Sequence, residues 1–127
     1  MTILYSILTS VVLAIGVSAS IPYESIEKAF ESNNEEVLAT YCGEKVLMSV
    51  LGEEGVYSRS QAQLVLKNFF SKWPSGTFKF YFKGKESAEG SFCIGKYSVG
   101  SNDFRVTINF KNTNQKYLIE SLNIDKD

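Results

Sequence analysis

The sequence predicts an α+β fold in which N-terminal helices and one long helix pack in a curved antiparallel sheet. Helix-like segments are confined to the first 73 residues, and four strand-like segments then follow from residue 77 to residue 125. Such segregation of helices from an antiparallel sheet is typical of α+β folds. Segment 104–111 also alternates apolar and polar residues, as expected for a strand with one buried face.

The first 19 residues predict a cleaved secretory signal peptide. They carry no charged side chain, and the first charge in the chain is Glu24. Their apolar run ends in "VSA", and small residues at this place are typical of a signal peptidase site, here after Ala19. A retained membrane anchor is the alternative, but the run is shorter than the roughly 20 apolar residues that a spanning helix needs. Cleavage would leave residues 20–127 as one exported domain, periplasmic or secreted.

Two short helices are expected next. Ser20 is a candidate N-cap for the first, with Pro22 tolerated in its first turn. Asn34 is a candidate N-cap for the second, which we expect from residue 35 to residue 42. Gly43 supplies the C-terminal stop.

A hairpin and the best-defined helix of the chain follow. Segment 45–51 is strand-like, and residues 52–55 form a turn into a return strand. Ser58 and Gln61 have the spacing of a capping box, which predicts that a helix begins there and covers residues 59–73. Its apolar stripe consists of Ala62, Leu66, Phe69 and Trp73, widened by Val65 and Phe70.

The four strand-like segments are separated by turn-rich linkers. They are about Thr77–Ser87, Gly90–Val99, Phe104–Lys111 and Lys116–Asp125. In the first of them, alternation predicts an aromatic face opposite a basic one. We expect Phe78 and Phe80 to be core. We expect Phe82 to lie nearer the sheet's end, where a pocket mouth could form, because Gly84 marks a bend.

The composition excludes several classes of function. The 13 basic and 14 acidic residues nearly balance, which argues against nucleic acid or an anionic membrane as the main partner. The chain has no histidine, the commonest general base and metal ligand. Cys42 and Cys93 match no metal or redox spacing, and they are either disulfide-bonded or buried small hydrophobes. We therefore expect no metal and no cofactor.

One catalytic hypothesis survives these exclusions. Glu120 shares an alternating face with Leu118 and Leu122, where a buried carboxylate would have a raised pKa and could act as a base with a tyrosine partner. In the other interpretation Tyr117 and Ile119 face inward, which leaves Glu120 in water. The candidate ligand-binding pocket is lined by Trp73, Phe82, Tyr97 and Glu120.

Four stretches carry a resemblance to a known family. They are "VYSRSQAQLVLKNFFSKWPSG", "FCIG", "FRVTINF" and "KYLIESLNIDK". Together they resemble domain of unknown function 4783 (DUF4783), a family of small exported proteins of Bacteroidota. That family is similar to the nuclear transport factor 2-like superfamily, whose fold is a cone of curved sheet around helices. The resemblance covers residues 21–126 and transfers no catalytic signature, and the superfamily hosts both enzymes and binding modules, so fold does not decide function.

The leading functional hypothesis is therefore an exported, non-catalytic domain that binds a small apolar ligand or an envelope protein partner. The alternative is a structural homodimer that pairs through the outer face of the sheet. An acid–base enzyme that uses Glu120 is the third hypothesis. A cavity lined by Glu120 and a tyrosine would favour the enzyme, whereas a filled cone with an apolar outer sheet would favour the dimer.

Overall fold

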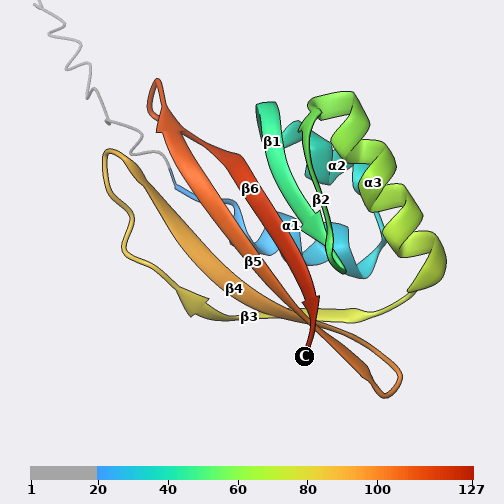
Figure 1. Cartoon of the computed structure of the whole chain (residues 1–127). Helices are drawn as coiled ribbons and strands as arrows, with labels where there is room; N and C mark the ends of the chain where they lie inside the picture. Colours follow the sequence, from blue (N-terminus) through green and yellow to red (C-terminus); the bar gives the residue numbers. More distant parts are fainter. Residues whose placement is uncertain (1–19) are drawn as a thin grey trace, which may run out of the picture.

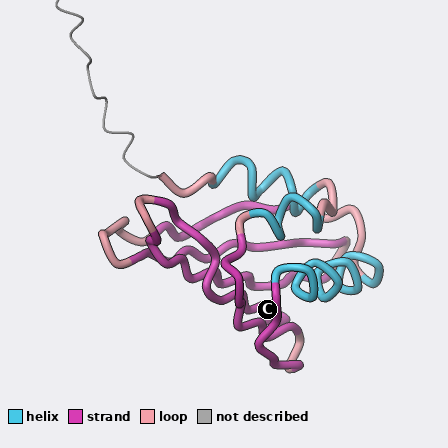
Figure 2. Tube along the Cα trace, turned by 90° about the horizontal axis from the view of Figure 1, so that it is seen from above, coloured by secondary structure: helices cyan, strands magenta, loops and turns pink. Residues whose placement is uncertain are grey.

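The computed structural model describes residues 20–127, in which three helices pack against one side of a curved six-stranded sheet (Figures 1 and 2). Residues 1–19, with the predicted cleavage site, lie outside the described residues. The elements are α1 (Tyr23–Glu31), α2 (Glu35–Thr40), β1 (Cys42–Val50), β2 (Glu53–Ser58), α3 (Arg59–Lys72), β3 (Thr77–Lys83), β4 (Gly90–Val99), β5 (Asn102–Thr113) and β6 (Lys116–Lys126). Within this part of the chain, no helix is long and apolar enough to cross a bilayer.

The strand order is β2-β1-β6-β5-β4-β3. Strands β3 to β6 form the predicted antiparallel meander. Strand β1 joins it by pairing in parallel with β6, and β2 pairs antiparallel with β1 at the edge of the sheet. The sequence predicted both the hairpin and the meander, whereas the parallel pairing that unites them in one sheet became apparent only in the structure.

The helix boundaries follow their caps. The Asn34 side chain accepts a hydrogen bond from the Val37 amide, and Ser58 and Gln61 form the predicted capping box. The prediction for Ser20 is wrong: α1 begins at Tyr23, and Pro22 occupies the N-cap position without a side-chain cap. Helix α2 also ends at Thr40, two residues earlier than expected, because the chain enters β1 directly afterwards.

The core lies between the helices and the inner face of the sheet and is dominated by aromatic rings. Phe30 of α1 stacks on Phe78 of β3, with ring centroids 4.4 Å apart. Phe69 of α3 meets Phe104 of β5 edge to face at 5.3 Å. Phe78 and Phe80 are both buried, which confirms the expectation for these two residues. No polar or charged residue is fully buried in the described part of the chain.

A bulge in β3 reverses the direction of its last side chains. Phe80 is opposite Gly95, but Phe82 is opposite Ile94, so Tyr81 is an extra residue. An extra residue shifts the alternation by one. Phe82 consequently leaves the aromatic inner face and packs on the outer face.

A second bulge lies in β6 at Glu120. Ile119 is opposite Phe110 and Ser121 is opposite Asn109, which leaves Glu120 without a partner on β5. Tyr117 and Ile119 therefore face inward before the bulge, and Leu122 faces inward after it. Apolar residues on both sides of the bulge are therefore buried, and Glu120 is exposed. The inward direction of Tyr117 and Ile119 agrees with one interpretation of this strand, and that of Leu122 agrees with the other.

Candidate functional site

Tyr97 is fully buried and holds two connections of the fold together. Its hydroxyl donates to the Trp73 main-chain oxygen over 2.6 Å. It accepts from the Asn33 side-chain amide at 2.9 Å and from the Gly76 amide at 3.2 Å. The Tyr97 hydroxyl thus joins the α1–α2 turn to the segment that follows α3.

The interior beside Tyr97 is filled. A Cβ atom on Gly95 would overlap the Phe78 ring, and one on Gly76 would lie 2.6 Å from the Tyr97 ring. Real Cβ atoms do not approach other atoms this closely, so both glycines are required by the space that the rings occupy. The aromatic rings leave little room for an apolar ligand in this part of the cone.

The four candidate pocket residues are distributed over separate parts of the molecule. Trp73 and Tyr97 meet through the hydrogen bond described above. Phe82 lies on the outer face beside Phe92, with ring centroids 5.1 Å apart. Glu120 is exposed at the β6 bulge.

Glu120 lines a hollow of about 440 Å³ that opens where β1 separates from β6. The two strands pair at Cys42 and Ile119, and pair again only at Leu47 and Ser121. Four residues of β1 thus lie opposite Glu120 alone. The other residues around this hollow are Gly43, Glu44, Lys45, Arg59, Lys111, Thr113, Leu118 and Ile119.

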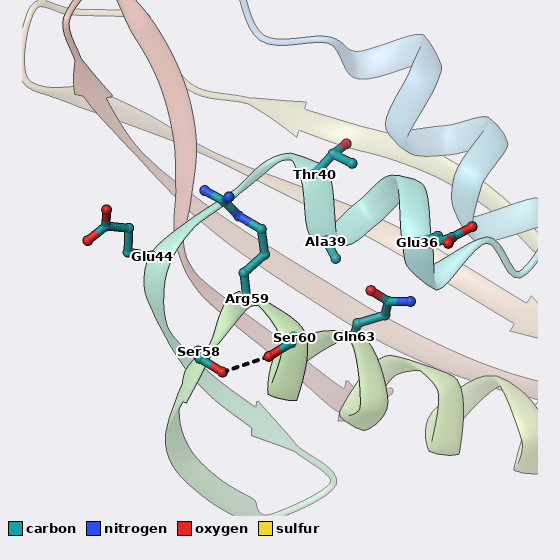
Figure 3. A pocket seen from close by; sticks show the side chains of 8 residues that line it. All are labelled: Glu36, Ala39, Thr40, Glu44, Ser58, Arg59, Ser60 and Gln63. Atoms are coloured by element: carbon teal, nitrogen blue, oxygen red, sulfur yellow. Dashed lines mark hydrogen bonds between the residues drawn. The ribbon is translucent and has the colours of Figure 1, made fainter.

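A neighbouring hollow of about 490 Å³ lies between α2 and the start of α3 (Figure 3). Glu44 and Arg59 line both hollows. The Arg59 Nε atom donates to the Cys42 carbonyl oxygen at 3.1 Å, which fixes the side chain between α3 and β1. Figure 3 shows this side chain reaching toward the α2–β1 connection, with Glu44 and Glu36 on either side. The sequence did not point to Arg59 as a site residue. It lies inside the capping box at the start of α3, so its presence there needed no functional explanation.

Both cysteines are buried and unbonded, so the disulfide alternative is wrong and the buried alternative is confirmed. The Cys42 thiol donates a weak hydrogen bond to the Leu38 carbonyl oxygen at 3.6 Å. Burial raises the pKa of Cys42 to about 11 and that of Cys93 to about 12. At neutral pH both are protonated thiols, which are poor nucleophiles.

No helix covers the outer face of the sheet (Figures 1 and 2). Two rows of side chains cross it in register. The first row, from β2 to β4, is Val56, Leu47, Ser121, Asn109 and Phe92. The second row, from β2 to β3, is Glu54, Ser49, Asn123, Thr107, Ile94 and Phe82.

The first row is apolar near both edges, whereas the second is apolar only toward β3 because it begins with Glu54. Both rows have small, uncharged side chains in the middle. Four apolar side chains are well exposed, with relative exposures of 66% for Val56, 52% for Leu47, 44% for Phe82 and 42% for Phe92. In the middle, the Asn109 side chain donates to the Ser121 hydroxyl at 2.9 Å. Single exposed apolar residues need no explanation, but several of them on one sheet face that no helix covers are typical of an interaction surface.

Comparison with known proteins fits this architecture. The family model for a domain of unknown function, DUF4783, matches residues 23–125. The chain belongs to the DUF4783 family. Comparison with curated proteins finds no match.

Solved structures agree with this assignment. A DUF4783 protein of Bacteroides uniformis is 30% identical, with a TM-score of 0.78 over 85% of this chain and 98% of that one. A second, from Bacteroides fragilis, is 31% identical, with a TM-score of 0.76 over 85% of this chain and 100% of that one. An NTF2-like protein of unknown function from Silicibacter pomeroyi has a TM-score of 0.61 at 10% identity, over 82% of this chain and 88% of that one. The last likeness concerns the fold alone and confirms the predicted NTF2-like architecture.

Proposed function

We propose that this DUF4783 protein is an exported, non-catalytic domain that assembles as a homodimer through the outer face of its sheet. The observation that carries the proposal is the combination of a filled interior with an uncovered outer face. The rings around Tyr97 fill the space where a cone fold would hold a ligand. The exposed apolar side chains lie on the opposite side of the sheet.

The size of the outer face suits a dimer. Six strands at about 4.8 Å spacing, crossed by four rows of outward side chains, give a face of roughly 25 by 25 Å. That is of the same order as the about 800 Å² that each partner buries in a standard interface. Face-to-face packing of two sheets is a common way to bury such surfaces.

An acid–base role for Glu120 receives no support from its surroundings. The bulge directs Glu120 into the open hollow beside β1. Tyr97, the tyrosine of the candidate pocket, is buried on the inner face and hydrogen-bonded to three protein groups. A general base needs a substrate within hydrogen-bond reach and a partner group close by, and these two residues do not share a space.

The experiment is a measurement of oligomeric state. Residues 20–127 contain the whole sheet and its core, so this segment is purified and analysed by native mass spectrometry over a range of concentrations. Asn109→Arg places a long charged side chain at the centre of the outer face and should give a monomer. The matched control is Leu64→Arg, at an exposed apolar position of α3, which should stay dimeric. A wild-type chain that is monomeric at about 1 mM, the weak limit of specific association, would refute the proposal.

The Arg59 hollows favour a second candidate, the binding of a small carboxylate. The Arg59 Nε atom donates to the Cys42 oxygen, and the Arg59 side chain lines both hollows. Guanidinium groups bind carboxylates in a bidentate geometry. Titration with benzoate, followed by NMR, should shift the signals of residues around Arg59 in the wild type and not in Arg59→Met. Equal shifts in both proteins would exclude this site.

A further inference from the structure

Strand β1 is longer than the stretch of β6 that it faces, and the excess opens the hollow beside Glu120. Cys42 of β1 is opposite Ile119 of β6. The next pair along the two strands is Leu47 and Ser121, so β1 takes five steps where β6 takes two. At about 3.3 Å per residue, these steps are roughly 16 Å and roughly 7 Å of strand. The extra residues of β1 therefore bow away from β6, and the hollow of about 440 Å³ lies in the gap.

Main-chain groups border this gap without a strand partner. In the described part of the chain, Gly43 and Glu44 are opposite no residue of β2 or β6, and Glu120 is opposite no residue of β1 or β5. All three residues line the hollow. A main-chain N–H or C=O group outside a ladder needs another hydrogen-bond partner, and the peptide group of a bound chain offers both a donor and an acceptor. The gap therefore suits a ligand that contains peptide bonds.

The charged side chains around the hollow are of both signs and do not form ion pairs with one another. The cations are Lys45, Arg59 and Lys111, and the carboxylates are Glu44 and Glu120. Within residues 20–127 the one salt bridge joins Arg105 to Asp125, at the other end of β5 and β6. A ligand with a negative and a positive end therefore finds an opposite charge for each, without breaking an ion pair of the protein.

From the open ladder and the mixed charges we infer that this hollow binds a short peptide with free ends, two or three residues long. The inference rests on the second candidate function, carboxylate binding at Arg59, and extends it from a simple carboxylate to a peptide. The C-terminal carboxylate binds Arg59, which lines the hollow from the start of α3, and the N-terminal ammonium binds Glu120 of β6. The peptide groups in between meet the main chain of Gly43 and Glu44.

The size of the hollow sets the length of the peptide. A sphere of the same volume is about 9 Å across, and an extended chain spans at most about 3.6 Å per residue. Two residues then span roughly 7 Å and three span roughly 10 Å, whereas a single amino acid would reach only one of the two charged walls. The volume also lies in the range of small-ligand pockets, about 300–1,000 Å³.

A simple anion would use only part of this site. Glu44 and Glu120 line the same hollow as Arg59, and their carboxylates repel a second negative charge. A ligand that also carries an ammonium group turns Glu120 from a repulsive neighbour into a partner. Benzoate should therefore bind more weakly than a peptide of matching length that has both ends free.

Trialanine tests the inference, because it has two free ends and small side chains. Residues 20–127, labelled with ¹⁵N, are titrated with trialanine, with N-acetyl-trialanine and with trialanine amide. The main-chain amide signals of residues that line the hollow report binding by NMR. Trialanine should bind with a Kd of about 1 mM or tighter, as is usual for a ligand of this size. Loss of either end charge should weaken binding at least about tenfold, because the opposing group of the protein is then left without its partner.

Two variants assign the ends of the peptide. Glu120→Gln should bind trialanine and N-acetyl-trialanine equally well, and it should still prefer trialanine to trialanine amide. Arg59→Met should lose the preference for trialanine over its amide and keep the preference for a free ammonium group. The matched controls, Glu31→Gln and Lys67→Met, change exposed helix positions that do not line the hollow and should keep both preferences. Circular dichroism checks that each variant is folded.

Benzoate and trialanine together separate this inference from the carboxylate site on which it rests. If benzoate binds at Arg59 but trialanine at about 10 mM does not, the peptide inference fails and the carboxylate site stands. If neither ligand binds, both fail. Equal affinity for trialanine and its two blocked forms would also overturn the inference, because the ends of the peptide would then not be recognised. Tighter binding of trialanine, with one preference lost in each variant, is the result we expect.

Discussion

The hydroxyl of Tyr97 donates a hydrogen bond of 2.6 Å to the main-chain oxygen of Trp73, and it is at the same time the acceptor for Asn33 and Gly76. Tyr97→Phe removes all three bonds, although the Asn33 side-chain amide still donates to the Phe30 main-chain oxygen at 2.9 Å. We expect a loss of about 1–3 kcal/mol in the free energy of unfolding, measured by urea denaturation. Tyr81→Phe, at an exposed position, is the control and should change stability by less than about 0.5 kcal/mol. Equal effects would show that the Tyr97 hydroxyl stabilises nothing.

The bulge at Tyr81 predicts unequal roles for the phenylalanines on either side of it. Phe80→Ala should cost about 3–5 kcal/mol, because it opens a cavity beside Phe78 and Tyr23. Phe82→Ala should cost about 1 kcal/mol or less, because its side chain is exposed on the outer face, where its ring meets that of Phe92. Paired denaturation curves decide the matter. Equally large losses would place Phe82 in the core.

The same bulges mark the limit of sequence reasoning on this chain. Alternation correctly predicted that Phe78 and Phe80 are core, because period-two burial holds along any regular strand. It kept Phe82 on the aromatic face, although the extra residue Tyr81 turns it outward. In β6, regular alternation cannot bury both Ile119 and Leu122, because they are three residues apart. The structure buries both, because Glu120 is an extra residue between them. A bulge depends on pairing with a neighbouring strand, and one strand's own sequence does not reveal it.

The candidate site was predicted less well than the fold for a related reason. Capping and helical periodicity are local, so α3 and its buried Phe69 were predicted nearly to the residue. The hollows around Arg59 arise where β1 separates from β6. These two strands are more than 70 residues apart in the sequence. The gap in their pairing leaves no recognisable residue pattern in either strand.

The buried thiols predict a loss of stability at alkaline pH. In the unfolded chain a thiol loses its proton above about pH 8.5, whereas the folded chain keeps Cys42 and Cys93 protonated until about pH 11 and 12. The stabilisation is fully present below pH 8.5 and is lost as the pH rises toward these values, by up to about 1.4 kcal/mol per pH unit for each thiol. Urea denaturation at pH 7 and pH 10 measures it. The Cys42→Ala, Cys93→Ala double variant should lose less stability over this interval, and identical losses would refute the assignment.

The leader predicts processing after Ala19. Mass spectrometry of the protein from the envelope or medium of the expressing cell should find Ser20 as the amino terminus, because the apolar run ends in small residues there. A charged residue in place of Ala19, as in Ala19→Arg, should block cleavage and raise the mass by that of the leader. Recovery of the wild-type chain at full length in membranes would contradict the prediction.

Gly95 gives the most stringent test of the filled interior. A Cβ atom at this position would overlap Cζ of the Phe78 ring, and that ring is itself held by stacking on Phe30. Gly95→Ala must therefore displace both rings, and overpacking of this kind costs about 1–3 kcal/mol. Gly43→Ala is the matched control, because its Cβ atom would meet only ordinary contacts at 3.7 Å. An alanine there should be neutral or slightly stabilising, since glycine weakens a strand. If Gly95→Ala were as stable as Gly43→Ala, the cone would have room beside Phe78, and binding of an apolar ligand inside it would again become the better explanation of function.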